Sequence, residues 1–432
     1  MSPEVIVAGK GLAAYNFSAE YAEKSPDATV HVLGQEYSSP RSWFALGSRM
    51  PSEAMNAIGR NEIKTHELTG TRFAFFEGGS VASDVSIDLK GELPSGSCLM
   101  IDDADLKRFY KEKLSAYSSV VLHEGGVVSA RSNDGLIRVE TSIGEQIEGQ
   151  IAVDASGSFS ELQRKHEPKL IDDDPMVVWI HGYRVEGEFD PNTMIFPLKD
   201  VSTGRLSWIA PWSDGVADVL ASDYCRLSEY KQKTEELEET YSRFAQLSED
   251  NNLCVIRDRG ERITGKIRVV PIRRPGYEQR IFPVGDAAGQ ACPNMAEGIT
   301  TALHQSRILA DALHDNSSLT PQEYFNMWRK GETAEYPYNL QLSFLVNRLR
   351  HEQAGQNRAI YEAIVRHGST EDKLRLLTNR SIGVSDISFI ATAIRSNPQI
   401  LALVARHFGT AALFKLIPGV FDQALYGEGD RK

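Results

Sequence analysis

The hydrophobic and polar positions near the start of the chain follow first a strand pattern and then a helical one. Residues 5–8 (VIVA) form a continuous apolar run, which is typical of a strand buried on both faces. A helical pattern covers residues 15–24, and residues 29–33 form a second β-rich run after a Pro-Asp turn. The pattern therefore predicts a strand–turn–helix–strand unit.

Two later segments repeat the buried strand that ends in a turn. Residues 151–157 (IAVDASG) form one, and residues 280–290 (RIFPVGDAAGQ) form the other, with a long helix predicted from Gly298 onward. Ligands of open α/β sheets bind at the carboxyl ends of parallel strands, where the Gly and Asp residues of these segments would lie. Three such strand ends in one chain predict a single shared nucleotide site.

Other periodicities fill the segments between these strands. Alternating patterns within residues 61–96 and 167–251 predict a second, antiparallel sheet that leaves a substrate pocket between two domains. Residues 231–249 read as a charged amphipathic helix. From residue 320 onward only helical periodicity remains.

The predicted fold is therefore α/β, with three parts. A discontinuous, Rossmann-like nucleotide-binding domain takes residues 1–60, 97–166 and 252–319. An inserted antiparallel sheet domain takes residues 61–96 and 167–251, and a helical C-terminal domain takes residues 320–432.

The glycine spacing after the first strand is that of a dinucleotide loop. Residues 9–14 (GKGLAA) follow G-x-G-x-x-A, so Gly9 allows a tight turn, Gly11 lets backbone approach a pyrophosphate, and Ala14 allows close helix packing. An acidic residue is expected about 20 positions after the last small residue. That count falls on Gly34, so Glu36 stands two positions late. The alternative is a strand–turn–helix with incidental glycines.

Composition excludes several classes of function. The 432 residues carry 47 Lys and Arg against 59 Asp and Glu, a net charge of −12, so we expect no nucleic-acid partner. The four cysteines contain no C-x-x-C pair, which argues against a zinc ribbon or a dithiol redox motif, and we expect no metal site. Residues 260–266 (GERITGK) fit the start of a Walker loop, but Ile267 replaces the magnesium-binding Ser or Thr and a strand pattern follows.

The sequence also bears on where the protein acts. No signal-peptide pattern opens the chain and no run of about 18 apolar residues occurs, so a cytoplasmic protein is expected. Residues 400–421 are apolar but interrupted by charges and Pro418. They could lie against lipid as a peripheral membrane contact, although burial against the nucleotide-binding domain is the simpler interpretation.

At residues 154–164 (DASGSFSELQR) and 285–299 (GDAAGQACPNMAEGI) the chain resembles the FAD-dependent oxidoreductases of the geranylgeranyl reductase and aromatic hydroxylase superfamily, which includes flavin monooxygenases. The resemblance covers most of residues 1–320 and implies FAD as cofactor. It implies that Asp286 binds the ribityl chain and that the amides of Gly298 and Ile299 face the flavin. The cofactor-binding residues expected are Gly9, Gly11, Leu12, Ala13, Ala14, Glu36, Asp154, Gly157, Gly285, Asp286, Gly289, Pro293, Gly298 and Ile299.

A third segment, residues 205–222 (RLSWIAPWSDGVADVLAS), is similar to the substrate motif of geranylgeranyl reductases. Trp208 and Pro211 match that motif, whereas Leu206 and Ala210 replace its Tyr and Phe. The candidate substrate residues are Trp208, Pro211, Trp212 and Trp43, with core packing as the alternative for the tryptophans. Flavin halogenases share the nucleotide motifs, but only Trp208 and Pro211 meet their signature, so halogenation is not expected.

The resemblance implies a flavoenzyme that transfers hydride from reduced flavin to a double bond of a small, lipophilic, isoprenoid- or polyene-like substrate. NAD(P)H, reduced ferredoxin or reduced flavin would supply the electrons. The alternatives are an FAD monooxygenase of specialised metabolism, a non-redox enzyme like lycopene cyclase, and a flavin-binding assembly or sensor protein. No catalytic side chain is identified, and the oligomeric state stays open.

Overall fold

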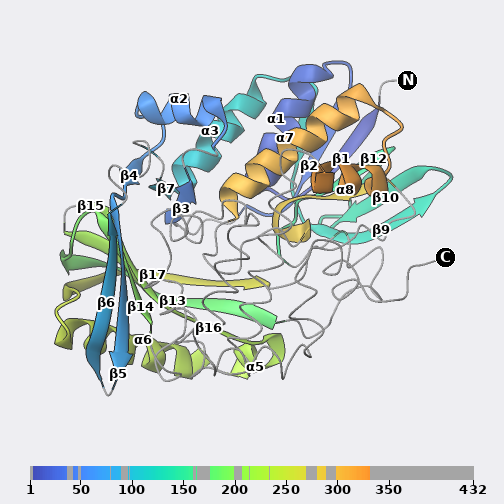
Figure 1. Cartoon of the computed structure of the whole chain (residues 1–432). Helices are drawn as coiled ribbons and strands as arrows, with labels where there is room; N and C mark the ends of the chain where they lie inside the picture. The colour runs from blue at the N-terminus through green and yellow to red at the C-terminus, as the bar shows by residue number, and fades with distance from the viewer. Residues whose placement is uncertain are drawn as a thin grey trace, which may run out of the picture.

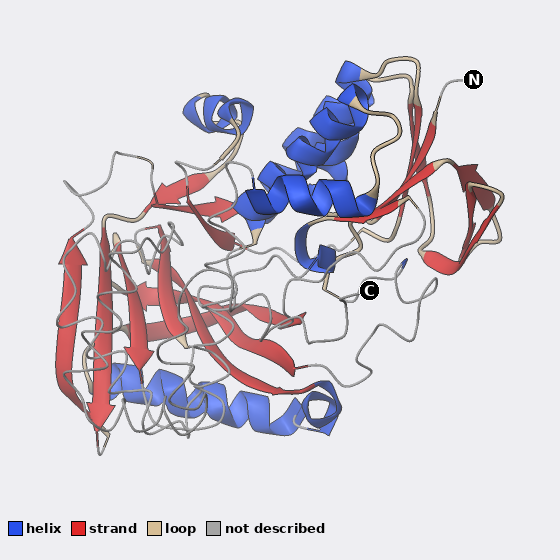
Figure 2. Cartoon of the chain, turned by 45° about the vertical axis from the view of Figure 1, so that its right-hand side comes forward, coloured by secondary structure: helices blue, strands red, loops and turns tan. Residues whose placement is uncertain are grey.

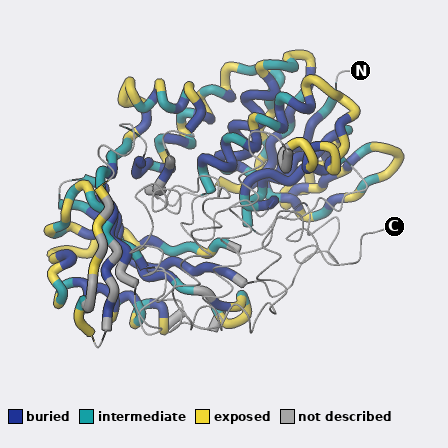
Figure 3. The backbone as a smooth tube through the Cα atoms, in the orientation of Figure 1, coloured by how far each residue is buried: buried dark blue, intermediate teal, exposed yellow. Residues whose placement is uncertain are grey.

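The computed structural model describes residues 3–36, 42–46, 50–77, 79–88, 96, 98–158, 162, 176–198, 207–213, 215–232, 234–268, 280–288 and 298–330. Two large sheets dominate this part of the chain, and helices cover one face of each (Figures 1 and 2). Figure 3 shows that buried residues concentrate in the two sheets and in the helices packed on them.

The first large sheet is five-stranded and parallel, in the order β18-β12-β1-β2-β8. Its strands are β1 (Glu4–Ala8), β2 (Thr29–Leu33), β8 (Val120–His123), β12 (Ile151–Asp154) and β18 (Ile281–Pro283). All four residues of β12 are buried, as are four of the five in β1, because both faces of the sheet are covered. This is the Rossmann-like arrangement that the three apolar runs predict.

Helices cover one face of the parallel sheet. They are α1 (Leu12–Lys24), α3 (Asp103–Ser115) and α7 (Ile299–Asp315), whose apolar side chains form one core with Val5 and Val7. The opposite face packs on a small antiparallel sheet of β9 (Val127–Asn133), β10 (Leu136–Thr141) and β11 (Gln146–Gly149). Removing this apolar surface from water stabilises the domain by about 25 cal/mol per Å² buried.

The second large sheet has seven strands in the order β17-β13-β16-β15-β14-β5-β6. Its strands are β5 (Gly70–Glu77), β6 (Ser80–Asp88), β13 (Met176–Glu188), β14 (Thr193–Leu198), β15 (Trp208–Ser213), β16 (Val216–Arg226) and β17 (Val255–Arg268). Helices α5 (Leu227–Gln232) and α6 (Thr234–Asp250) lie along one face (Figure 1). The other face is turned toward the parallel sheet (Figure 2).

Two details of this sheet differ from the sequence prediction. An antiparallel sheet was expected, but β14 and β5 pair in parallel, because the chain enters both strands from the same end. Strand β17 pairs with β13, so residues 255–268 belong to this sheet although the sequence pattern places 252–319 in the nucleotide-binding domain. The Walker-like residues 260–266 lie inside β17, so the rejection of a phosphate loop there is confirmed.

A third, small sheet lies between the two large ones. It contains β3 (Ser42–Leu46), β4 (Thr65–Glu67) and β7 (Cys98–Asp102), with α2 (Ser52–Gly59) between β3 and β4 in the chain. Helix α8 (Pro321–Lys330) is the last described element, so most of the predicted C-terminal domain, including residues 400–421, lies outside the described residues. No helix in the described part of the chain is long and apolar enough to cross a membrane.

Candidate functional site

The carboxyl ends of β1, β12 and β18 meet at one edge of the parallel sheet. Backbone hydrogen bonds join the turns that leave these strands: Ala155 N–H donates to Ala8 C=O at 2.8 Å, and Val284 N–H donates to Asp154 C=O at 3.0 Å. The three strand ends identified in the sequence therefore do form one edge.

Two glycines allow the turns to pack this closely. Gly9 has a φ of +127°, and a Cβ built on it would lie 2.2 Å from the carbonyl oxygen of Ala155. Gly285, at φ +61°, lies between Ala13 of α1 and Ala302 of α7, 3.4 and 3.3 Å from its ideal Cβ. Both positions require glycine, since a side chain would meet backbone or a neighbouring helix.

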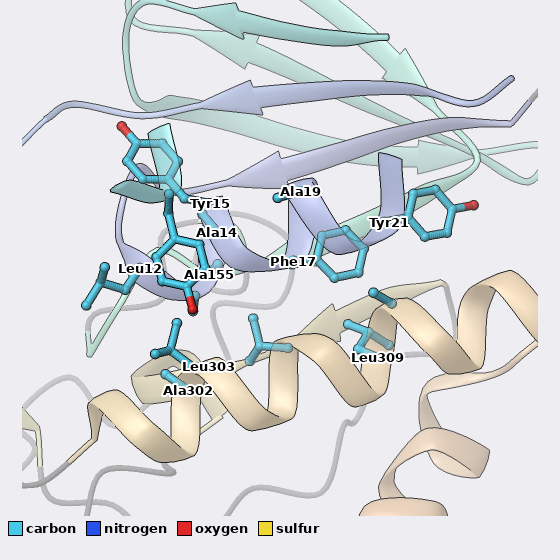
Figure 4. Close-up of a cluster of buried hydrophobic side chains, with 14 of the residues drawn as sticks. Leu12, Ala14, Tyr15, Phe17, Ala19, Tyr21, Ala155, Ala302, Leu303 and Leu309 are labelled. Atoms are coloured by element: carbon cyan, nitrogen blue, oxygen red, sulfur yellow. The ribbon is translucent and has the colours of Figure 1, made fainter. Parts of the chain in front are cut away.

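The N-termini of α1 and α7 open at this same edge. The two helices lie side by side, with Phe17, Leu303 and Leu309 between them (Figure 4). The Asn16 amide nitrogen donates to Leu303 C=O and to Ser306 Oγ, both at 2.7 Å. Because Gly285 touches the first turn of each helix, the two positive dipole ends point at one place.

In the described part of the chain, neither helix N-terminus has a side-chain cap. Gly11 precedes α1 and Gly298 precedes α7, neither first turn contains an acidic residue, and neither cap position makes a side-chain hydrogen bond. Among the described residues no atom lies within 4 Å of an ideal Cβ on Gly11, so this part of the chain leaves open space beside its backbone. Uncapped amides next to open space are suited to bind an anion such as a diphosphate. Leu12, Ala13 and Ala14 form the first turn of α1 and are buried.

Asp286 follows β18 at this edge. It belongs to a short 3-10 helix, η4 (Gly285–Ala288), and its Oδ2 accepts a hydrogen bond from Ser158 Oγ at 3.0 Å. Burial raises the pKa of Asp286, and the Ser158 hydrogen bond opposes that shift. Within the described residues Oδ1 has no hydrogen-bond partner, so it can accept one from a ligand hydroxyl.

The carboxylate of Asp154 is used differently. This side chain is completely buried, and its Oδ1 accepts hydrogen bonds from the Ser156 backbone N–H at 3.2 Å and from Ser156 Oγ at 2.5 Å. Asp154 thus stabilises the turn after β12, which ends in Gly157 at φ +79°. We expect Asp154 to support the cofactor site through this turn.

Glu36 follows β2 on the adjoining strand end. Its Oε1 accepts hydrogen bonds from Tyr15 of α1 and from Lys111 of α3. Glu36 is therefore next to the glycine-rich loop despite its late position in the sequence. Gly289 and Pro293, which were also predicted to bind the cofactor, lie outside the described residues.

The candidate substrate residues lie on different surfaces of the seven-stranded sheet. Trp208 is partly buried and packs against Val178, Ile180, Leu220 and Ile263 on the face opposite α6. Pro211 pairs in register with Ala217, whose side chain belongs to the core under α6, so Pro211 lies on that same face, opposite the face of Trp208. Trp43 lies in β3, opposite Ile101 of β7.

Trp212 lies close to two cations. Its side chain is 5% exposed, and Lys64 Nζ and Arg184 Cζ each lie 5.4 Å from its ring centroid. Arg184 in turn pairs with Asp218, at 2.9 Å from Nε to Oδ1. Trp212 therefore contacts the ion pair of the sheet and the segment before β4, which favours a packing role.

Several residues of the site were not singled out in the sequence. Ser158, Tyr15 and Lys111 each bond a carboxylate that the motifs identify. Ser158 stands directly after Gly157 and could have been inferred from the turn, whereas Lys111 is 75 residues from Glu36 and has no local signal. No group of three or more His, Cys, Asp or Glu residues in the described segments could hold a metal ion.

The residues present fit a dinucleotide cofactor. Among the described residues, the open space beside Gly11 leaves room for a diphosphate at the N-terminus of α1, and the N-terminus of α7 opens at the same edge. Asp286 and Glu36 each keep a carboxylate oxygen that bonds no described residue, and hydroxyl groups are the donors such oxygens accept. FAD offers hydroxyls on both sides of its diphosphate.

Comparisons with known proteins agree with this geometry. No protein-family model and no curated protein sequence matches the chain. Solved structures do. A geranylgeranyl bacteriochlorophyll reductase-like protein from Thermoplasma acidophilum is 14% identical with a TM-score of 0.67, covering 94% of this chain and 99% of its own. The flavin-dependent brominase Bmp2 is 13% identical with a TM-score of 0.64, covering 92% and 100%.

Klebsiella pneumoniae HpxO, complexed with FAD and uric acid, is 14% identical with a TM-score of 0.60, covering 87% of this chain and 96% of its own. The fold is that of the FAD-dependent oxidoreductases. The family resemblance seen in the two nucleotide motifs is thereby confirmed at the level of the fold.

Proposed function

We propose that this protein is an FAD-dependent oxidoreductase that reduces a double bond of a small lipophilic substrate. The observation that carries the proposal is the convergence of three strand ends and two helix N-termini on one edge, where Asp286 and Glu36 each have a carboxylate oxygen that bonds no described residue. Bound FAD would supply the two-electron chemistry, with a nicotinamide, ferredoxin or flavin donor reducing it.

The protein's own residues would bind and orient the cofactor. The amides at the start of α1 would hold the diphosphate, Glu36 a ribose hydroxyl, and Asp286 a ribityl hydroxyl. Ser158 fixes one oxygen of Asp286 and so directs the other toward the ligand. The uncapped N-terminus of α7 would stabilise negative charge on the flavin ring.

A lipophilic substrate is favoured by the inner face of the seven-stranded sheet, which is the face opposite α6. Val178, Ile180, Leu220 and Ile263 form an apolar cluster there, with Trp208 packed against it. This face is turned toward the parallel sheet (Figures 1 and 2), and an apolar wall of this kind would exclude water from a reacting double bond.

A monooxygenase is the second candidate. The Arg184–Asp218 ion pair lies on the same inner face, next to Ala210 in the register, and interrupts its apolar surface. A small polar aromatic substrate would suit such a pair better than a long polyene would. HpxO was solved with uric acid, and PqsL of Pseudomonas aeruginosa is described as a probable FAD-dependent monooxygenase.

One experiment separates these functions. The purified chain is photoreduced with FAD under anaerobic conditions and mixed with polyprenyl substrates or with oxygen and aromatic substrates, and product masses are measured. A gain of two hydrogens with reoxidation of FAD indicates a reductase, a gain of oxygen a monooxygenase, and an isomer with FAD still reduced a cyclase. A protein that binds no flavin would refute all of them.

Asp286→Ala tests the site within the same experiment. It removes the free carboxylate oxygen and should weaken FAD retention about tenfold or more, the loss of one hydrogen bond to a charged group. Asp315→Ala is the matched control, because Asp315 is an exposed carboxylate at the far end of α7. Equal flavin retention in the two variants would contradict the role of Asp286.

A further inference from the structure

Glu36 reaches the dinucleotide loop through an unusual turn. Strand β2 ends at Leu33, and Gly34 follows at φ +153°. A Cβ on Gly34 would lie 3.0 Å from the Lys10 backbone nitrogen and 3.1 Å from the Gly9 carbonyl carbon. The segment after β2 therefore packs directly on the glycine-rich loop, which brings Glu36 beside α1.

Two donors converge on one oxygen of Glu36. Tyr15 Oη donates to Oε1 at 3.0 Å, and Lys111 Nζ donates to the same oxygen at 2.5 Å. Within the described residues Oε2 accepts no hydrogen bond. The carboxylate is thus fixed at one oxygen and open at the other.

This arrangement contributes little to folding stability. The side chains of Lys111 and Glu36 are 47% and 50% exposed, and ion pairs at that exposure are weak because water and salt screen them. Its effect is on position and charge. The Lys111 hydrogen bond lowers the pKa of Glu36 against the effect of burial, and the Tyr15 hydrogen bond adds to this. An ionised carboxylate can only accept hydrogen bonds, so its free oxygen requires a donor such as a hydroxyl.

The two donors come from two helices that share one hydrophobic core. Tyr15 is buried in α1, the helix whose N-terminus faces the diphosphate position, and only its hydroxyl reaches Glu36. Lys111 belongs to α3, which packs on the same core as α1. An exposed Glu side chain would otherwise lose rotamer freedom on binding, which weakens affinity.

We infer that Tyr15 and Lys111 are positioning residues that hold Glu36 Oε1, so that Oε2 accepts a hydrogen bond from a hydroxyl of the adenosine ribose. This inference rests on the proposed FAD function and deepens it. It also explains how Glu36 could bind the ribose although it stands two residues after the expected position. The Gly34 turn and the two donors hold its side chain beside the glycine-rich loop.

The test measures recognition of the ribose apart from any reaction. Full-length protein freed of flavin is titrated calorimetrically with ADP and with 2′,3′-dideoxy-ADP, and the ratio of the two Kd values is the readout. The wild type should prefer ADP about tenfold, the value of one hydrogen bond to a charged group. Glu36→Ala should bring the ratio to about one, since the acceptor is gone.

The positioning residues are tested by the same ratio. Lys111→Met and Tyr15→Phe should each lower it to about threefold or less, since neither residue touches the ribose but both orient Glu36. In a Glu36→Ala background neither change should move the ratio. Lys111→Arg, which keeps a donor, should restore it. Lys107→Met is the matched control, because Lys107 lies one turn earlier on α3 and pairs with Asp103 instead.

Each outcome decides a separate question. A wild type that binds neither ADP nor FAD would overturn the proposed function itself. A wild type that binds ADP and prefers it, with that preference unchanged in Lys111→Met and Tyr15→Phe, would overturn only the positioning role. If Tyr15→Phe fails to fold, the exposed Lys111 decides the inference alone.

Discussion

The two large sheets use polar residues in opposite ways. In the parallel sheet they stand after the strand ends, where Asp286 and Glu36 each keep an oxygen without a partner among the described residues. In the seven-stranded sheet they stand within strands and bond one another, as Arg184 does with Asp218. The first arrangement is open to a ligand, and the second holds a sheet together.

A second network in the seven-stranded sheet also consists of polar groups that bond one another. His181 of β13 is completely buried, and its Nε2 lies 2.8 Å from Glu238 Oε2 of α6. Tyr183 Oη donates to the same carboxylate oxygen at 2.9 Å. These groups join the sheet to its covering helix, on the face turned away from the parallel sheet, and so do not form part of the proposed site.

The largest effect is expected from Gly9, which follows β1 and packs against the turn after β12. Gly9→Ala places a methyl 2.2 Å from the Ala155 carbonyl oxygen at a φ that L-residues avoid, and should destabilise the protein by about 3 kcal/mol or more. Gly11→Ala, two residues away, meets no atom of the described residues within 4 Å and should change stability by less than about 1 kcal/mol while weakening FAD binding. Urea unfolding and flavin titration of both variants test this prediction, and equal losses of stability in Gly9→Ala and Gly11→Ala would contradict it.

The next largest effect is expected when the Arg184–Asp218 ion pair of the seven-stranded sheet is broken. Arg184→Met leaves Asp218, whose side chain is 2% exposed, without this partner and should cost about 3 kcal/mol in the free energy of unfolding. The double variant Arg184→Met with Asp218→Leu should recover most of that loss, because no buried charge remains. Denaturant unfolding measures both, and additive losses in the double variant would count against this prediction.

A charge cluster between α1, α2 and α3 should give an intermediate, pH-dependent effect. Burial opposes ionisation of Glu20, but hydrogen bonds from Lys24 and Lys113, at 2.9 and 3.2 Å, outweigh it and lower the pKa to about 2 from 4.5. A lowered carboxylate pKa stabilises the fold above the unfolded value, and this stabilisation is lost as the pH falls toward the folded value. Glu20→Gln should therefore cost about 2 kcal/mol near neutral pH.

The stability difference between Glu20→Gln and the wild type should narrow as the pH falls from 4.5 toward 2. Thermal unfolding across this range measures it. Glu23→Gln is the control, since Glu23 is 56% exposed and lies 3.5 Å from Lys113. A difference that stays constant with pH would contradict the role given to Glu20.

The smallest effect is expected from an exposed pair with the same cross-strand geometry as Arg184–Asp218. Arg138 and Glu148 lie directly opposite each other in β10 and β11 at 2.7 Å, with side chains 59% and 50% exposed. Arg138→Met should change the free energy of unfolding by no more than about 0.5 kcal/mol. If Arg138→Met lost nearly as much free energy of unfolding as Arg184→Met, burial would not explain the difference between the two ion pairs.

Local patterns in the sequence identified the parallel sheet and its site. The strands at residues 5–8, 29–33 and 151–154 and the helix after Gly298 were all predicted from apolar runs and glycine spacing. These features are local, because a strand, its turn and the following helix are consecutive in the chain. Asp286 and Glu36 could be named for the same reason.

Long-range pairing could not be predicted in this way. Lys111 is 75 residues from Glu36, and Ser158 is 128 residues from Asp286. Nothing in the sequence assigned β17 to the seven-stranded sheet or paired β14 with β5 in parallel. Register decides which face each tryptophan takes, and register depends on strands that are distant in the chain.

The sequence by itself determined that this chain builds a Rossmann-like edge with glycine turns and carboxylates, because turn geometry and periodicity are set by neighbouring residues. Only the tertiary structure decided which oxygens of those carboxylates are held and which are left for a ligand. Tyr15, Lys111 and Ser158 fix them from separate segments, and contacts of that kind exist only once the strands have assembled.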